Sequence, residues 1–265
     1  MKVLMLGDIV GKIGRKGVTE ALPKLKKKYK PDLVIANAEN LAHGKGITEK
    51  TLQEMMDAGV DFFTSGNHIW SNKAEVDKIL GENELPIIRP ANYPPDVLGA
   101  GHKIVEVGVY KVLIVNLMGR VFFRENFDCP FRKLKEILEE YKNEKLSAVI
   151  VDLHAEATSE KNSLPRYFDG KVSAVFGTHT HVQTSDEQIL EKGTAFITDV
   201  GMVGLKNSSL GVDLDNVIKN FLDQTPQAHE IPEHGTCQID GVFAIIEPET
   251  SLATKIERIK LDVEV

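Results

Sequence analysis

The sequence is organised around Val60-Asp-Phe-Phe-Thr64 and the four residues that follow it, Ser65-Gly66-Asn67-His68. The apolar run predicts a short buried strand. A glycine, an amide and an imidazole come directly after it. In an open sheet, ligands gather beyond the carboxyl ends of the strands. We therefore expect this stretch to carry functional groups to the end of a sheet.

Other apolar runs are followed by the same kinds of side chain. Asp8 follows residues 2–6, Glu39 and Asn40 follow 33–37, His154 follows 148–152, and His179 and His181 follow 172–177. Each run reads as a buried strand, and each ends in carboxylate, amide or imidazole groups. We expect these strand ends to converge on one site, although the order of residues along the chain leaves the convergence a hypothesis.

The order of predicted elements indicates an α/β fold. The first half reads as strands at 2–6, 33–36 and 61–65 with helices at 15–30 and 48–58 between them, and with Gly11, Gly14 and Gly17 in a loop before the first helix. Such a β-α-β-α-β order predicts a parallel sheet with right-handed crossovers. Further predicted helices are 73–80, 130–143 and 215–222, and residues 201–204 are expected to form a loop.

The second half changes to antiparallel patterns. Hairpins are expected at 102–116 and 187–198, and alternating strands at 236–247 and 252–261. The simplest architecture is two mixed sheets packed together and covered on the outside by helices.

The length and composition of the chain exclude several classes of protein. A chain of 265 residues is long enough for one large core, so residues 1–265 are expected to form a single domain. A net charge of −7 argues against bulk binding to nucleic acid backbones. The two cysteines form no CxxC pattern, and no apolar run reaches the roughly 20 residues that span a bilayer. We expect a cytoplasmic protein, and the sequence leaves open whether it forms a homo-oligomer.

The chemistry at the strand ends is that of a metal site. With strand-like alternation, His179 and His181 leave one side of the chain and can face one or two cations. Asp8 and Glu39 would repel each other in a buried site unless cations lay between them. The alternatives are a helix cap or Asx turn for Asp8 and a solvated loop acid for Glu39. Imidazole, carboxylate and amide groups together suit iron, manganese or zinc better than calcium.

At this point the sequence resembles a known family, the calcineurin-like metallophosphoesterases. Gly66-Asn67-His68 matches one family block, and Asp8, His154 and Gly177-Thr-His-Thr-His181 follow the family's order. Two features depart from the common pattern: Val10 replaces a histidine, and Ala38-Glu39-Asn40 replaces a Gly-Asp block. These departures resemble the YmdB-like branch of small bacterial phosphodiesterases.

The likeness to that branch covers essentially the whole chain. It includes Gly7-Asp-Ile-Val-Gly11, Asn37-Ala-Glu-Asn40 and Thr198-Asp-Val-Gly-Met202. It implies a four-layer α-β-β-α sandwich with two mixed sheets, the metallo-dependent phosphatase fold. The cofactors it implies are two transition metal ions, with iron and manganese favoured over zinc.

The resemblance also implies a role for each site residue. Glu39 would bridge the two metals, Asp8, Asn40 and His181 would complete one, and Asn67, His154 and His179 would complete the other. His68 would not be a ligand but would donate a proton to the leaving alkoxide, as general acid catalysis requires. A hydroxide bridging the metals would attack the phosphorus. The implied substrates are small cyclic nucleotides, 2′,3′- or 3′,5′-linked.

Two other functions use the same groups. One is a metal-binding regulator that hydrolyses little and acts through a partner, against which the intact His68 argues, because a binder needs no proton donor. The other is a phosphomonoesterase with the same metals. Hydrolysis of matched monoester and diester substrates separates these hypotheses.

Overall fold

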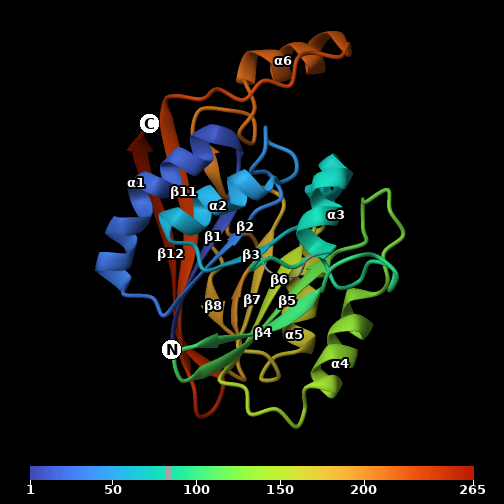
Figure 1. Cartoon of the computed structure of the whole chain (residues 1–265), viewed down its shortest axis with the longest axis vertical. Helices are drawn as coiled ribbons and strands as arrows, with labels where there is room; N and C mark the ends of the chain where they lie inside the picture. Colours follow the sequence, from blue (N-terminus) through green and yellow to red (C-terminus); the bar gives the residue numbers. More distant parts are fainter. Residues whose placement is uncertain (82–84) are drawn as a thin grey trace.

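The computed structural model describes residues 1–81 and 85–265. Its strands form two mixed sheets (Figure 1). In the first sheet the spatial order is β12-β11-β10-β1-β2-β3. The bounds are β1 Lys2–Ile9, β2 Leu33–Asn37, β3 Phe62–Thr64, β10 Met202–Leu205, β11 Thr236–Glu247 and β12 Leu252–Glu264. Strands β10, β1, β2 and β3 run parallel, and β11 and β12 pair antiparallel with their neighbours.

The second sheet has the order β4-β5-β6-β7-β9-β8. The bounds are β4 His102–Val107, β5 Tyr110–Met118, β6 Ala148–His154, β7 Ala174–Thr178, β8 Gln188–Ile189 and β9 Ala195–Ile197. Its centre, β5 to β9, is parallel, while β4 and β8 pair antiparallel at the two edges. The expected hairpins at both edges and the mixed character of both sheets are confirmed.

The core lies in three apolar layers, and the two faces of β1 contribute to two of them. Leu4 and Leu6 face the helices that cover the first sheet, whereas Val3 and Met5 face the second sheet. A third layer, which includes Leu134, lies between the second sheet and its own helices. Because successive strand residues point to opposite faces, a strand covered on both sides must be apolar at every position. The four-layer α-β-β-α sandwich is therefore confirmed.

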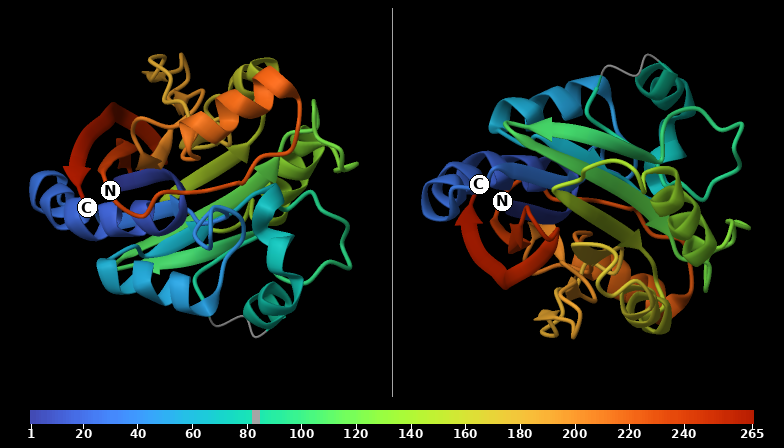
Figure 2. Two further views of the ribbon diagram at one scale, coloured as in Figure 1. Left: turned by 90° about the horizontal axis from the view of Figure 1, so that it is seen from above. Right: turned by 90° about the horizontal axis from the view of Figure 1, so that it is seen from below.

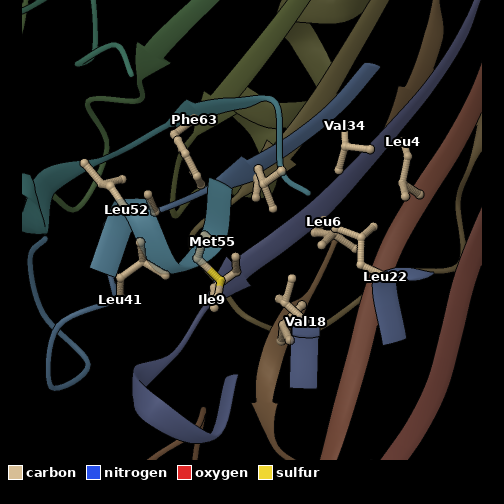
Figure 3. Close-up of a cluster of buried hydrophobic side chains, with 14 of the residues drawn as sticks. Leu4, Leu6, Ile9, Val18, Leu22, Val34, Leu41, Leu52, Met55 and Phe63 are labelled. Carbon is tan, nitrogen blue, oxygen red and sulfur yellow. The ribbon is translucent and has the colours of Figure 1, made fainter. Parts of the chain in front are cut away.

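Helices cover the outer faces of both sheets. The bounds are α1 Gly11–Tyr29, α2 Glu49–Ala58, α3 Lys73–Gly81, α4 Pro130–Glu140, α5 Thr158–Tyr167 and α6 Leu214–Asp223, with a 3₁₀ helix, η1, at Asn67–Asn72. Figure 3 shows the apolar contact of α1 and α2 with the first sheet, where Val18 and Leu22 meet Leu6, and Met55 lies near Ile9. Helix α2 begins after the predicted cap, Thr48, whose side chain accepts a hydrogen bond from the Thr51 amide.

The prediction for the start of α1 was wrong. The helix begins at Gly11 and includes Gly14 and Gly17, which were expected in a loop. Both glycines let the helix lie close to the sheet: a Cβ atom on Gly14 would stand 2.4 Å from the carbonyl oxygen of Val203, and one on Gly17 would stand 2.4 Å from Cys237 Sγ. Close approach to the sheet, not loop conformation, accounts for these two residues.

Three elements were missed or misplaced. Residues 201–204, expected as a loop, overlap strand β10, which pairs parallel with the end of β1. Helix α5 was not predicted, because its sequence is polar and contains Pro165. Helix α4 ends at Glu140, three residues before the predicted end.

Residues 206–235, here called the arm, leave the first sheet after β10 and return to it at β11. The arm contains α6, which projects beyond one end of the sheets (Figure 1), and the segment that follows α6 crosses that end (Figure 2). In the described part of the chain, no helix has the length and hydropathy needed to cross a membrane.

Candidate metal centre

The predicted site residues all lie at one end of the sandwich. Asp8 is the penultimate residue of β1, Glu39 and Asn40 follow β2, and Asn67 and His68 open η1 after β3. His154 is the last residue of β6, and His179 and His181 follow β7. The two sheets thus supply opposite halves of one cluster, as expected for parallel strands whose carboxyl ends share an edge.

One group of atoms gathers around His154. Its Nε2 atom lies 3.0 Å from Glu39 Oε1, 3.0 Å from His179 Nδ1 and 3.3 Å from Asn67 Oδ1. Ligand atoms of Glu39, His154 and His179 all lie within 4.8 Å of one another, close enough to share a metal ion. One carboxylate, two imidazoles and an amide oxygen form a donor set that suits a transition metal.

A second group lies beside the first, around Asp8. Asp8 Oδ1 is 3.9 Å from His181 Nε2, and Asp8 Oδ2 accepts a hydrogen bond of 3.2 Å from the His179 amide. Asp8 and Asn40 are buried, and within the described chain neither Asp8 Oδ1 nor Asn40 Oδ1 has a hydrogen-bond partner. Buried polar atoms without a partner are costly. A second cation would give these two oxygens a partner, and His181 Nε2 near Asp8 offers it a third ligand atom.

On its other nitrogen, each of the three histidines already has an oxygen partner that is not one of the candidate ligands. His154 Nδ1 lies 2.9 Å from Thr178 Oγ1, His179 Nε2 lies 3.0 Å from Glu156 Oε2, and His181 Nδ1 lies 3.0 Å from the Leu210 carbonyl oxygen. An oxygen partner on that side holds the proton there and leaves the other nitrogen free to coordinate. This is the usual arrangement around histidines that bind metals.

The partners of His154 form a buried chain that sequence reasoning missed. Thr178 donates to Asp152 Oδ1 at 2.7 Å, and Asn37 donates to Asp152 Oδ2 at 3.2 Å. Asp152 is buried, and burial raises its pKa to about 6, against the opposing effect of His154. Asp152 is two residues before His154 on β6, so both side chains point to the same face. Asp152, a charged residue inside an otherwise apolar strand, was the sequence feature that could have indicated this buried chain.

A second supporting network fixes the loop between His179 and His181. The backbone amide of Thr180 donates to Asp199 at 3.1 Å and its hydroxyl at 2.7 Å. Asp199 also pairs with Lys161 of α5, and both are buried. His179 and His181 have φ values of 98° and 62°, in the left-handed region that non-glycine residues rarely adopt. Such strain persists only where the surroundings enforce it, and it concentrates at functional sites.

The charges of the cluster are strongly coupled. Burial alone would raise the pKa of Glu39, but His154 and His68 outweigh it and hold that pKa well below its usual value. Burial alone would lower the pKa of His154, but Glu39 and Asp8 raise it to about 9. Burial, reinforced by His154, lowers the pKa of His179 to about 3. His179 is therefore neutral at physiological pH, as a metal ligand must be.

His68 stands at the open side of the cluster. Its backbone amide donates to Glu39 Oε2 at 2.7 Å, and its Nδ1 atom lies 3.3 Å from Glu39 Oε1. Its side chain is 31 % exposed, whereas that of Glu39 is 1 % exposed. Gly66, two residues earlier, leaves room for the cluster, because a Cβ atom there would lie 2.3 Å from His154 Nε2 and 2.5 Å from Glu39 Oε2.

A cavity of about 280 Å³ opens onto these groups. Its polar lining includes Glu39, His68 and His179, and the arm closes one side. Arm residues in the lining are Leu210, Val212, His229 and Ile231. The cavity can admit a small molecule to the cluster while the arm shields it from solvent.

The chain is similar to proteins of known family. The sequence profile described as YmdB-like protein matches residues 4–259. A Bacillus subtilis (strain 168) protein named 2′,3′-cyclic-nucleotide 2′-phosphodiesterase is 44% identical over 99% of this chain and 97% of its own length.

Solved structures agree with the sequence match. A hypothetical protein from Thermus thermophilus is 40% identical, with a TM-score of 0.91 over 99% of both chains. A Mycoplasma pneumoniae protein described as a novel phosphatase is 37% identical, with a TM-score of 0.92 over 100% of this chain and 94% of its own. Family profile, sequence and fold therefore coincide over nearly the full length, and the chain belongs to the YmdB-like family.

Proposed function

We propose that the chain is a dimetal phosphodiesterase that opens the 2′,3′-cyclic phosphate of small nucleotides at the 2′ ester bond. That it hydrolyses phosphoesters is supported by relatives named as a phosphodiesterase and a phosphatase. The observation that carries the finer proposal is the placement of Glu39. Its buried carboxylate contacts His154, His179 and His68, and its charge is close enough to Asp8 to affect the pKa of Asp8.

The ligands are proposed as two sets that share Glu39. Asp8, Asn40 and His181 would hold one ion, and Asn67, His154 and His179 the other. Unpartnered oxygens in the first set and a compact donor group in the second support this division. Bound divalent ions would lower the pKa of a water molecule and neutralise the charge on the phosphate oxygens.

The remaining chemistry falls to His68. Attack of water oxygen on phosphorus forms one P–O bond and breaks the bond to the ribose 2′ oxygen, which must then gain a proton. His68 is partly exposed at the cavity and held at Nδ1 by Glu39, so its Nε2 atom can supply that proton. The product retains a 3′-phosphate, which identifies the bond that was cut.

The test compares three variants with 2′,3′-cyclic AMP and added Mn²⁺. Glu39→Gln should lose both rate and bound metal, because it removes the shared carboxylate. His68→Ala should keep the metal and lose about 10²- to 10⁴-fold in kcat, the usual share of a general acid. His102→Ala is the matched control, since His102 packs against Tyr141 and contacts none of the proposed ligands.

Product analysis separates this proposal from its rivals. Accumulation of 3′-AMP supports a phosphodiesterase, whereas release of inorganic phosphate from 3′-AMP supports the phosphatase reaction after which the Mycoplasma pneumoniae relative is named. A 3′,5′-cyclic substrate tested in parallel decides between the two cyclic linkages. Full activity of both Glu39→Gln and His68→Ala would refute the assigned roles.

A further inference from the structure

A row of aromatic rings begins at the candidate centre. Phe123 lies against His179, with ring centroids 5.0 Å apart, and Phe127 lies behind Phe123 at 5.8 Å. Tyr93 packs edge-on against Phe127 at 4.9 Å and against Trp70 at 5.8 Å. The row thus runs from a proposed metal ligand to Trp70, two residues after His68.

The row lies close enough to the centre to be influenced by its charge. Burial raises the pKa of Tyr93, and the charges of Glu125 and Glu39 add to the increase. The ring of Phe123 is only partly buried, although His179 and Phe127 flank it. An aromatic surface is therefore available beside the cluster.

The loop that carries Phe123 is tied to the elements that build the site. The Gly119 amide donates to the carbonyl oxygen of His154 at 2.9 Å. Glu160 of α5 accepts hydrogen bonds of 3.0 Å from the backbone amides of Arg120 and Val121. These contacts hold the loop at a fixed position relative to His154 before any substrate binds.

The loop also bears features that folding alone does not favour. Phe122 is 83% exposed and has a φ of 71°, a combination of exposed apolar surface and backbone strain. Strained residues and exposed aromatic rings concentrate where ligands bind. By contrast, the apolar side chains that line the cavity, such as Leu210 and Ile231, are aliphatic and offer no π face.

We infer that Phe123 is the platform on which the nucleobase of the substrate stacks. The inference rests on the proposed function, because the cyclic phosphate must lie at the metal ligands for the base to reach the adjoining ring. Every nucleobase has a π face, so stacking recognises a base without selecting one. The substrate class is therefore nucleoside cyclic phosphates with any of the four bases.

The experiment measures kcat/KM with two substrates that differ only in the base. One is adenosine 2′,3′-cyclic phosphate, and the other is methyl riboside 2′,3′-cyclic phosphate, which has the same reacting bond and no base. Variants are Phe123→Ala, Phe123→Leu, which keeps apolar bulk beside His179, and Phe123→Trp. Phe131→Ala is the matched control, because Phe131 is a partly buried ring on α4 that contacts Tyr167.

The expected result is a selective loss. Phe123→Ala and Phe123→Leu should lower kcat/KM for the adenosine substrate at least about fivefold, mainly through KM, with little change for the methyl riboside. Phe123→Trp should retain the preference for the adenosine substrate, as should Phe131→Ala. Equal losses with both substrates would overturn the inference and leave Phe123 as packing for His179, as would no loss with either.

Failure of the proposed function gives a different pattern. If the unmodified protein with Mn²⁺ hydrolyses neither cyclic phosphate, the proposed function is refuted and this inference falls with it. If it hydrolyses both equally well, the function stands and only the role of Phe123 is refuted.

Discussion

Replacing Thr178 by valine tests how the structure prepares His154 for a metal. The hydroxyl lies 2.9 Å from His154 Nδ1 and donates to Asp152 Oδ1 at 2.7 Å. A hydroxyl has one proton, and Thr178 donates its proton in the hydrogen bond to Asp152. Thr178 must therefore be the acceptor in its hydrogen bond with His154, and His154 Nδ1 is the donor. A metal ion would then have to displace only the proton on Nε2, the nitrogen that faces Glu39 and His179. Valine has the same shape and removes only this relay.

These contacts allow the losses in metal affinity and in stability to be estimated. Loss of such a partner behind a metal-binding histidine lowers metal affinity about 10- to 100-fold. The substitution also leaves a buried donor and a buried acceptor unpaired, which costs roughly 1–3 kcal/mol in the free energy of unfolding. Stability alone therefore cannot identify the effect on the metal.

Thr194→Val provides the matched control. Thr194 is also fully buried in the second sheet, donates to the Val172 carbonyl at 2.7 Å and accepts from the Gly170 amide at 2.9 Å. It lies just before β9, at the end of the parallel strands opposite the candidate centre. It should lose similar stability and bind metal normally. The assays are calorimetric titration of metal-free protein with Mn²⁺ and urea unfolding in EDTA.

The result that refutes the reasoning is equal Mn²⁺ affinity in Thr178→Val and the unmodified protein, together with a stability loss matching that of Thr194→Val. Thr178 would then be an ordinary core hydrogen bond. Thr178→Ser, which restores the hydroxyl, should recover most of the lost metal affinity.

Three further changes have definite expected outcomes. Gly66→Ala places a Cβ atom 2.3 Å from His154 Nε2 and should abolish metal binding, measured by elemental analysis. Gly81→Ala, whose Cβ atom meets no described residue within 4 Å, should not. Burial raises the pKa of Asp240 from 3.8 to about 6, so the folded state binds more protons than the unfolded chain and stability falls as pH rises between those values. Asp240→Asn should therefore be more stable by about 1–3 kcal/mol at pH 8 and no different at pH 3, measured by urea unfolding. Lys161→Met leaves the buried Asp199 carboxylate without its counter-ion and should cost about 3–5 kcal/mol in unfolding free energy, measured in urea at pH 7.

Each of these has a contrary outcome. Normal metal content in Gly66→Ala would mean that the cluster tolerates displacement of its histidine. A stability difference for Asp240→Asn that does not change between pH 3 and pH 8 would show that the carboxyl ionises normally in the folded state. A loss below about 1 kcal/mol in Lys161→Met would show that water reaches the remaining carboxylate.

The gathering of the candidate site residues was predictable, because they follow strands whose apolar runs are clear in the sequence. Asp8, Glu39, His154 and the 179–181 pair each follow or end a buried run, and the structure brings them within a few ångströms. Asn37 also ends a buried strand, but nothing in the sequence indicated that its amide donates to Asp152 on the other sheet.

The remaining misses have physical causes. Helix α5 is mostly polar in sequence, and one of its buried positions holds Lys161, which pairs with Asp199, so the apolar periodicity of a covered helix is missing there. Gly14 and Gly17 resembled a loop because glycine disfavours helices, yet close packing on β10 and β11 requires them. Contacts made across the fold outweighed local propensity in both cases.

We propose above all that Glu39 is a ligand of both metal ions at one end of the sandwich. The most direct measurement is elemental analysis of freshly purified protein beside Glu39→Gln. We expect two equivalents of transition metal per chain in the unmodified protein and at most one in Glu39→Gln. A single equivalent, or none, in the unmodified protein, or the same content in both, would contradict it.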